Sequence, residues 1–189
     1  KIASRVMAGE KLSKFNLKKK NKNTFAVKEA VFPFNKFPEV DVLLGPEMKS
    51  TGEAMGFDNN FGLSFAKSQI ASNNSIPLKG NAFISVKDKD KDKILNNAKK
   101  LVKFGFSLFA TSVTARYLVA NGVKCKKVNK VNQGSPHIVE RLNRKNISLV
   151  INTTEGKDSI SDSFSLRRTS LVNKVPYFTT IAAANACLE

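Results

Sequence analysis

Residues 82–122 read AFISVKDKDKDKILNNAKKLVKFGFSLFATSVTARYLVANG, and this stretch decides the fold that the sequence predicts. The apolar runs at 82–86 and 106–110 have the length and composition of buried strands. Each run is followed by a segment with the apolar spacing of a helix, at 90–104 and 111–119. Glycine follows each helical segment, as it commonly does at the end of a helix. The stretch therefore predicts two consecutive strand–helix units.

The same alternation continues to the end of the chain. Further strands are predicted at 125–128, 148–152 and 176–178, and further helices at 136–142, 159–171 and from Thr179 onward. Strands that alternate with helices form parallel sheets covered on both faces. The fold class predicted for this part is α/β, with a Rossmann-like parallel sheet.

The residues before this region follow a different pattern. They predict a strand at 24–32, a turn and a short extended run at 34–44, and a helix at 62–71. The inner face of that helix is predicted to carry Leu63, Phe65, Ala66 and Ile70. The polar segment 72–79, which contains a proline, is the predicted linker. We therefore expect two parts, residues 1–73 and 74–189.

Polar residues gather where the predicted strands end. Ligands of parallel α/β sheets bind beyond the carboxyl ends of the strands. Hydroxyl groups and helix N-termini suit an anion, and a lysine adds a positive charge. Helix capping would explain any one of these threonines alone, but the same chemistry at three converging strand ends favours a phosphorylated small molecule. The residues are Ser85, Thr111, Ser112, Thr114, Asn129, Lys130, Asn152, Thr153 and Thr154.

The composition limits the other classes of function. The formal net charge of +17 would attract a polyanion, but the lysines are dispersed and lack interleaved aromatic residues. A solvated basic surface is therefore favoured over nucleic-acid binding. No apolar run approaches the ~20 residues of a membrane span. Two distant cysteines, Cys125 and Cys187, and one histidine, His137, argue against a disulfide framework or a multi-histidine metal site. We expect two reduced thiols in a cytoplasmic protein.

One long motif resembles a known family. Residues 33–56, PFNKFPEVDVLLGPEMKSTGEAMG, resemble the end of the second ATP-grasp unit of the carbamoyl phosphate synthetase large subunit. SRVMAGEKL at 4–12 resembles the same family. Downstream, NKV at 129–131, PHI at 136–138, INTTEG at 151–156 and RRTS at 167–170 resemble its methylglyoxal-synthase-like regulatory domain. The resemblance covers nearly the whole chain. It implies an ATP-grasp remnant at 1–73 and an allosteric domain at 74–189.

The resemblance also implies a function. The family makes carbamoyl phosphate from bicarbonate, glutamine-derived ammonia and two ATP, for arginine and pyrimidine biosynthesis. It acts with Mg or Mn and with a glutaminase small subunit. The groups that perform this chemistry are expected before Lys1, so this section is expected to hold no cofactor and no catalytic residue. Its implied role is regulation by UMP, IMP and ornithine.

The implied ligand residues follow from the matching positions. Thr179 and Glu29 match positions for ornithine, and Glu29 is equally well explained as a carboxylate on the surface of a strand. Val113 stands where the family commonly has glycine in Thr-x-Gly-Thr, which puts nucleotide control in question because valine adds bulk. The positions implied for the nucleotide are Ser85, Lys91, Thr111, Thr114, Lys130, Asn152, Thr154 and Lys157.

One enzymatic alternative is a free-standing methylglyoxal synthase. That reaction requires a carboxylate and a histidine beside a phosphate pocket. His137 is available for it, but the expected Gly-Gly-Asp-type loop is missing from the sequence.

Overall fold

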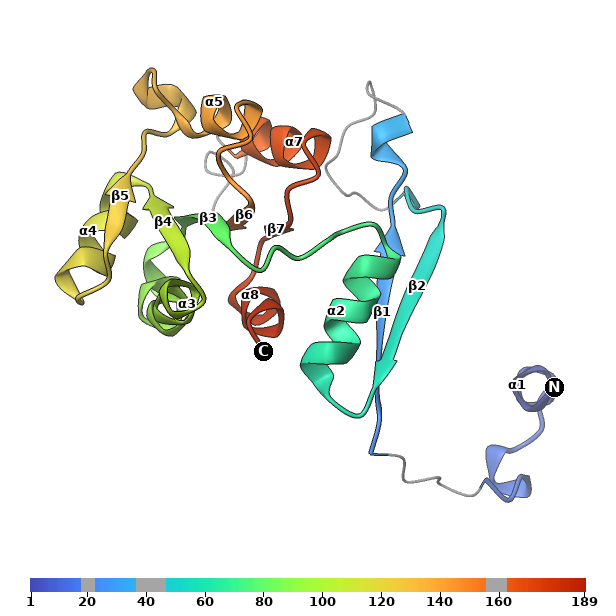
Figure 1. The fold of residues 1–189 in the computed structure, drawn as a ribbon. Helices are drawn as coiled ribbons and strands as arrows, with labels where there is room; N and C mark the ends of the chain where they lie inside the picture. The colour runs from blue at the N-terminus through green and yellow to red at the C-terminus, as the bar shows by residue number, and fades with distance from the viewer. Residues whose placement is uncertain (18–22, 37–46, 156–162) are drawn as a thin grey trace.

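The computed structural model describes residues 1–17, 23–36, 47–155 and 163–189 (Figure 1). Its central element is a five-stranded sheet with the strand order β5-β4-β3-β6-β7. All four strand pairs in this sheet are parallel, as the sequence predicted. The strands are β3 (Gly80–Ser85), β4 (Phe106–Ala110), β5 (Cys125–Lys127), β6 (Leu149–Asn152) and β7 (Tyr177–Phe178).

Helices cover both faces of this sheet. In Figure 1, α5 and α7 lie above it, and α3, α4 and α8 lie below it. The two faces follow from the alternation of side chains along a strand. In β3, Ala82 and Ile84 belong to the apolar core on one face, and Phe83 belongs to the core on the other. The helices are α3 (Lys91–Lys103), α4 (Ser112–Ala120), α5 (Ile138–Asn143), α7 (Phe164–Val172) and α8 (Ile181–Cys187).

The N-terminal part contains a smaller sheet. β1 (Phe25–Val31) pairs with β2 (Gly52–Asp58) in the antiparallel direction, and α2 (Phe61–Ala71) packs against both strands. The sequence predicted β1 and α2 but not β2, whose two glycines weaken the strand pattern. The remaining short elements are α1 (Ile2–Met7) and the 3-10 turns η1 (Leu12–Lys14), η2 (Phe34–Lys36), η3 (Asp88–Asp90) and η4 (Val131–Gln133).

The predicted inner face of α2 is wrong in part. Leu63 and Ile70 are 55% and 64% exposed. Phe65 is buried as predicted, and the other buried positions are Ser64, Ser68 and Gln69. Small residues are buried because α2 lies very close to β2. A side-chain carbon added at Gly56 would lie 1.8 Å from the Ser64 carbonyl oxygen.

The two parts of the chain share one core. Phe65 of α2 packs against Phe178 of β7, with ring centroids 6.3 Å apart. Phe65 also belongs to the same apolar cluster as Ile84, Leu101 and Leu118 of the larger sheet layer. The boundary at 73/74 stays a prediction, because contact across it does not define where a domain begins. Of the turn and extended run predicted at 34–44, residues 37–44 lie outside the described residues, as do residues 159–162 of the helix predicted at 159–171.

The two cysteines are free thiols, as predicted. Burial raises the pKa of Cys125 to about 11 and that of Cys187 to about 12. Because the thiolate is the reactive form, both side chains are inert near neutral pH.

The close approach of α2 to β2 gives a testable prediction. Gly56→Ala should destabilise the chain by ~1–3 kcal/mol, the usual cost of overpacking. The added carbon meets backbone atoms, which cannot rotate away. Gly52→Ala on the same strand is the matched control, because nothing lies within 4 Å of its added carbon. Urea unfolding of both variants measures the effect, and equal midpoints would contradict the packing described here.

Candidate functional site

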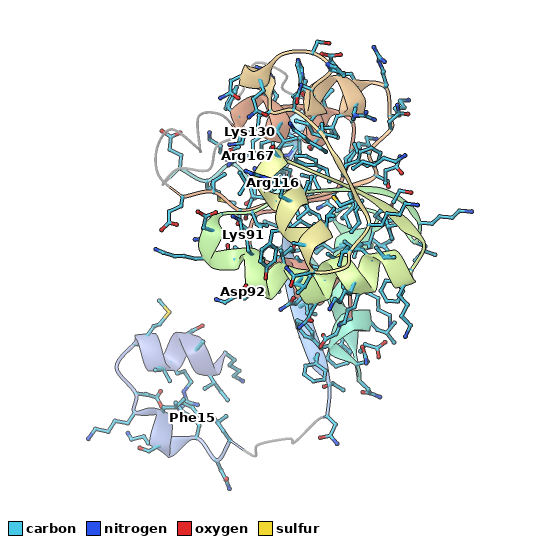
Figure 2. The ribbon with its side chains drawn as sticks, turned by 90° about the vertical axis from the view of Figure 1, so that its left-hand side faces the viewer. Phe15, Lys91, Asp92, Arg116, Lys130 and Arg167 are labelled. Carbon is cyan, nitrogen blue, oxygen red and sulfur yellow. The ribbon has the colours of Figure 1, made fainter. Side chains whose placement is uncertain are left out.

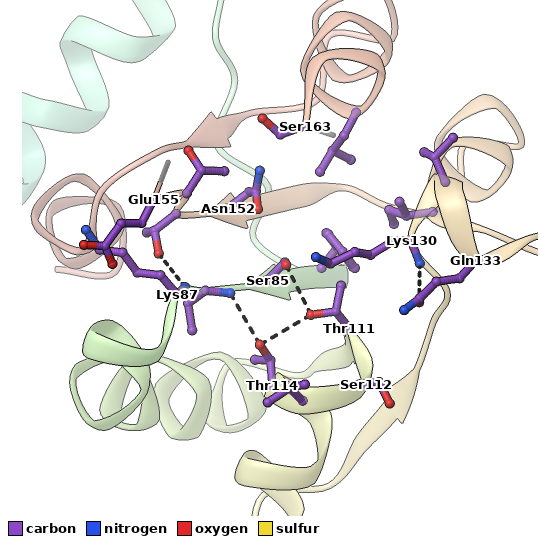
Figure 3. A pocket seen from close by; sticks show the side chains of 18 of the residues that line it. Ser85, Lys87, Thr111, Ser112, Thr114, Lys130, Gln133, Asn152, Glu155 and Ser163 are labelled. Carbon is purple, nitrogen blue, oxygen red and sulfur yellow. Dashed lines mark hydrogen bonds between the residues drawn. The ribbon is translucent and has the colours of Figure 1, made fainter. Parts of the chain in front are cut away.

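A cavity of about 540 Å³ lies at the carboxyl ends of β3, β4 and β6 (Figure 3). This is the edge where the sequence placed the site. Three strand ends supply its floor: Ser85 ends β3, Thr111 follows β4 and Asn152 ends β6. The loops after these strands form its walls. The described lining residues are Phe83, Ser85, Val86, Lys87, Asp88, Thr111, Ser112, Val113, Thr114, Lys130, Val131, Gln133, Ile138, Asn152, Thr153, Thr154, Glu155, Ser163 and Leu166.

A chain of hydroxyl groups crosses the floor of the cavity. Ser85 Oγ lies 3.2 Å from Thr111 Oγ1, and Thr111 Oγ1 lies 3.4 Å from Thr114 Oγ1. Thr114 Oγ1 also accepts a hydrogen bond from the Val86 amide at 3.4 Å. Thr111 and Thr114 are 7% and 1% exposed. Since each hydroxyl both donates and accepts, this row of hydroxyl groups can turn its protons toward a bound anion.

Helix α4 begins at this cavity. Thr111 is its N-cap residue, yet the Thr111 side chain makes no capping hydrogen bond. The capping explanation therefore does not apply to this hydroxyl. Residues 112–114 form the first turn of α4 and line the cavity. The N-terminus of a helix carries a partial positive charge and amide donors, which suit a phosphate group.

The end of β6 closes the opposite wall. Asn152 and Thr153 are 5% and 6% exposed. Thr153 Oγ1 accepts a hydrogen bond from the Lys87 amide at 3.1 Å, which ties the β6 loop to the β3 loop. Asn152 Nδ2 donates to the Tyr177 hydroxyl at 2.6 Å. Both residues are therefore held in place by neighbouring elements.

The charges around the cavity favour an anion. Its two described acidic lining residues each pair with a lysine: Asp88 with Lys91 at 2.6 Å, and Glu155 with Lys89 at 2.8 Å. The Lys89 ammonium holds the pKa of Glu155 below its usual value, so this carboxylate is ionised and its negative charge is balanced by Lys89. Lys130 also lines the cavity and has no ion-pair partner among the described residues. Lys87 lines it too, and its charge contributes to the lowered pKa of Glu155.

Most of the predicted nucleotide residues meet at this cavity. Ser85, Thr111, Thr114, Lys130, Asn152 and Thr154 all line it. Lys91 does not; its ammonium pairs with Asp88 at the start of α3, and Figure 2 labels it below Lys130 and Arg167. Lys157 lies outside the described residues.

Lys87, Gln133 and Ser163 also line the cavity, and the sequence analysis did not single them out. Lys87 follows β3 by two positions, so the rule that found Ser85 could have found it. Gln133 lies in η4, where its Oε1 accepts a hydrogen bond from the Lys130 amide at 3.0 Å. Ser163 precedes α7 and carries no local signal of a site.

A second, smaller cavity of about 170 Å³ lies between α2 and the β7 region. It is lined by Gln69, Asn74, Arg167 and Tyr177, together with apolar residues from η2 to β7. Gln69 Nε2 donates to Glu29 Oε2 at 2.8 Å, so Glu29 stands directly behind the lining. Thr179 is exposed and follows Phe178, which lines the cavity. The two residues predicted for ornithine thus flank this cavity without lining it.

No described helix has both the length and the apolar character needed to cross a membrane. Within the same residues, no group of three or more His, Cys, Asp or Glu side chains is placed to hold a metal ion.

Comparison with known proteins identifies the family. The model of the MGS-like domain matches residues 93–179. The carbamoyl phosphate synthase large chain of Mesorhizobium japonicum is 49% identical over 195 residues, covering 100% of this chain and 17% of the relative. The chain belongs to the carbamoyl phosphate synthase large-chain family. It thus spans only a small part of such a relative.

Two further matches refine this result. A protein of Aquifex aeolicus described as the C-terminal section of a carbamoyl phosphate synthase large chain is 51% identical, over 90% of this chain and 32% of that protein. The methylglyoxal synthase of Elizabethkingia anophelis has a similar fold, with a TM-score of 0.51 and 21% identity over 60% of this chain and 80% of that one. At this identity, the likeness concerns the fold alone. The Aquifex match agrees with the predicted large-chain section, and the methylglyoxal synthase match agrees with the predicted α/β fold.

The position of Glu29 gives a prediction about pH. Burial raises the pKa of Glu29 above its usual value, and the hydrogen bond from Gln69 offsets this only in part. The folded state therefore disfavours the ionised form of Glu29. The free energy of unfolding falls as the pH rises from about 4.5, the usual pKa, through the raised pKa of the folded state. Glu29→Gln removes this cost, so the variant should be more stable than the parent chain at pH 7. The advantage should shrink as the pH falls toward 4, where both states of the parent are protonated.

Thermal unfolding of both proteins between pH 4 and pH 7 measures this dependence. Glu53→Gln is the control, because Glu53 lies on the neighbouring strand with its side chain 57% exposed, and its surface ion pair with Lys28 contributes little to stability. A difference between Glu29→Gln and the parent that does not vary with pH would contradict the assignment.

Proposed function

We propose that this chain is the regulatory C-terminal section of a carbamoyl phosphate synthase large chain, and that a nucleoside monophosphate binds in the strand-end cavity. The observation that carries the proposal is the convergence of Ser85, Thr111 and Thr114 hydroxyls with the start of α4 and with Lys130 at one cavity. Neutral donors, a helix N-terminus and a lysine together form a typical phosphate site.

The size of the cavity supports a nucleotide. Its volume of about 540 Å³ falls within the usual range of small-molecule pockets, ~300–1,000 Å³. The hydroxyl floor would take the phosphate. The apolar part of the lining, Val131, Ile138 and Leu166, would take the ribose and base. Val113 lines the same cavity, in the first turn of α4, so its side chain would occupy space next to a ligand bound there.

We infer the activity of the full-length protein from the family. The large chain would make carbamoyl phosphate in the cytoplasm with ATP and Mg or Mn, beside a glutaminase small subunit, for arginine and pyrimidine biosynthesis. UMP and IMP would act at the strand-end cavity. Such control requires that the ligand bind two states of the enzyme with different affinity.

Ornithine would act at the second cavity. Glu29 is a half-buried carboxylate with a raised pKa, hydrogen-bonded to the neutral amide of Gln69. Burial of such a group is costly unless a positive charge joins it, and an ammonium group would supply that charge. The exposed hydroxyl of Thr179 stands on the β7 side of the same region.

A methylglyoxal synthase is the second candidate, favoured by the likeness of the fold. Its reaction requires a histidine at the phosphate site. His137 does not line the cavity, and its Nε2 lies 3.2 Å from Glu140 Oε1. We therefore expect no methylglyoxal from dihydroxyacetone phosphate, and turnover in that assay would favour this candidate instead.

Calorimetric titration of the 189-residue chain with UMP and IMP at moderate salt tests the proposal. We expect saturable binding of one or both ligands. Lys130→Ala should weaken it about tenfold or more, because a hydrogen bond to a charged group contributes ~1.5–3 kcal/mol. Lys103→Ala at the far end of α3 is the control, since it removes the same charge away from the cavity. Equal loss of affinity in both variants would indicate attraction by net charge alone, and no binding to folded chain would overturn the proposal.

A further inference from the structure

The strand-end cavity and the second cavity share a wall. Tyr177 and Arg167 both line the second cavity. Each is also hydrogen-bonded to a residue that lines the strand-end cavity. Asn152 Nδ2 donates to Tyr177 Oη at 2.6 Å, and Arg167 Nη2 donates to Ser163 Oγ at 3.1 Å. Two independent links, one from β6 and one from the start of α7, therefore join the cavities.

The two wall residues also contact each other. The Arg167 guanidinium carbon lies 6.0 Å from the centre of the Tyr177 ring. Arg167 Nε is buried without a hydrogen-bond partner, and no described carboxylate pairs with this side chain.

The Asn152–Tyr177 hydrogen bond can reverse its direction. An anion in the strand-end cavity attracts the amide protons of Asn152 and repels its carbonyl oxygen. A tyrosine hydroxyl both donates and accepts, so it can hold either end of the amide. If Asn152 turns its Nδ2 fully toward the anion, its Oδ1 faces Tyr177, which then becomes the donor. The ring of Tyr177 and the guanidinium above it respond to that change.

We propose that Tyr177 and Arg167 are positioning residues that couple the two cavities, so that a phosphorylated ligand in the strand-end cavity alters the second cavity through Asn152 and Ser163. This inference rests on the proposed phosphate site and adds to it a route of communication. By linkage, the effect is reciprocal: the factor by which the phosphorylated ligand changes the affinity of the second cavity for its ligand equals the factor by which that second ligand changes the affinity for phosphate.

The chain offers an internal probe for this coupling. It has no tryptophan and two tyrosines, Tyr117 and Tyr177. Tyr117 donates to Asp92 at 2.6 Å and links α4 to α3, away from the shared wall. In Tyr117→Phe, all tyrosine emission comes from Tyr177. In Tyr177→Phe, it comes from Tyr117, which makes the two variants matched controls for each other.

The experiment titrates both variants of the 189-residue chain with ribose 5-phosphate, which does not absorb where tyrosine is excited. Calorimetry measures the affinity independently. In Tyr117→Phe, the emission of Tyr177 should change and saturate at the calorimetric midpoint. In Tyr177→Phe, the emission of Tyr117 should stay constant. The affinity of Tyr177→Phe should be weaker by about two- to tenfold, the loss of one ordinary hydrogen bond, and that of Tyr117→Phe should match the parent chain.

The outcomes separate the two proposals. Calorimetric binding with constant Tyr177 emission and unchanged affinity in Tyr177→Phe would overturn the coupling and leave the phosphate site standing. No heat of binding from ribose 5-phosphate, UMP or IMP would overturn the proposed function, and the coupling with it. If far-UV circular dichroism shows that Tyr177→Phe is unfolded, the emission of Tyr177 in Tyr117→Phe decides the matter alone.

Discussion

The hydrogen-bond register of β3 with its two neighbours determines the rest of the site. Ile84 lies opposite both Ala110 of β4 and Ile151 of β6, and Ser85 lies opposite Asn152. This register brings the three strands to an end at the same level. It therefore sets Ser85, Thr111 and Asn152 side by side at the floor of one cavity (Figure 3). A shift of one residue would turn these side chains to the opposite face of the sheet.

Most of this arrangement could be predicted from the sequence. Apolar runs with helical segments between them specify a parallel sheet, and a parallel sheet specifies where the strand ends meet. The inner face of α2 could not be predicted in the same way. Its buried residues include Ser64 and Ser68, because Gly56 lets the helix approach the strand backbone. Apolar spacing alone assigns Leu63 and Ile70 to the core, and it cannot detect a close approach between two backbones.

The details of the cavity depend on tertiary contacts. The sequence resemblance implies Lys91 at the phosphate, and this stays a prediction; in the structure its ammonium pairs with Asp88, which lines the cavity. Ser163 and Gln133 reach the cavity from segments that show no strand–helix signal of a site. Tyr177 belongs to a strand of two residues, and its role depends on the 2.6 Å hydrogen bond to Asn152, 25 residues earlier in the chain. Such pairs become visible only when the chain is folded.

The order of the strands also has a consequence for how the chain acquires its site. The central strand β3 is made early, but its neighbour β6 follows only after β4 and β5. Pairing of β3 with β6 therefore requires the closure of a long loop, which is a slow step in folding. The cavity does not exist until this pairing is complete. A ligand that binds there binds only the finished sheet, so it stabilises the native state against every state in which β3 and β6 are still unpaired.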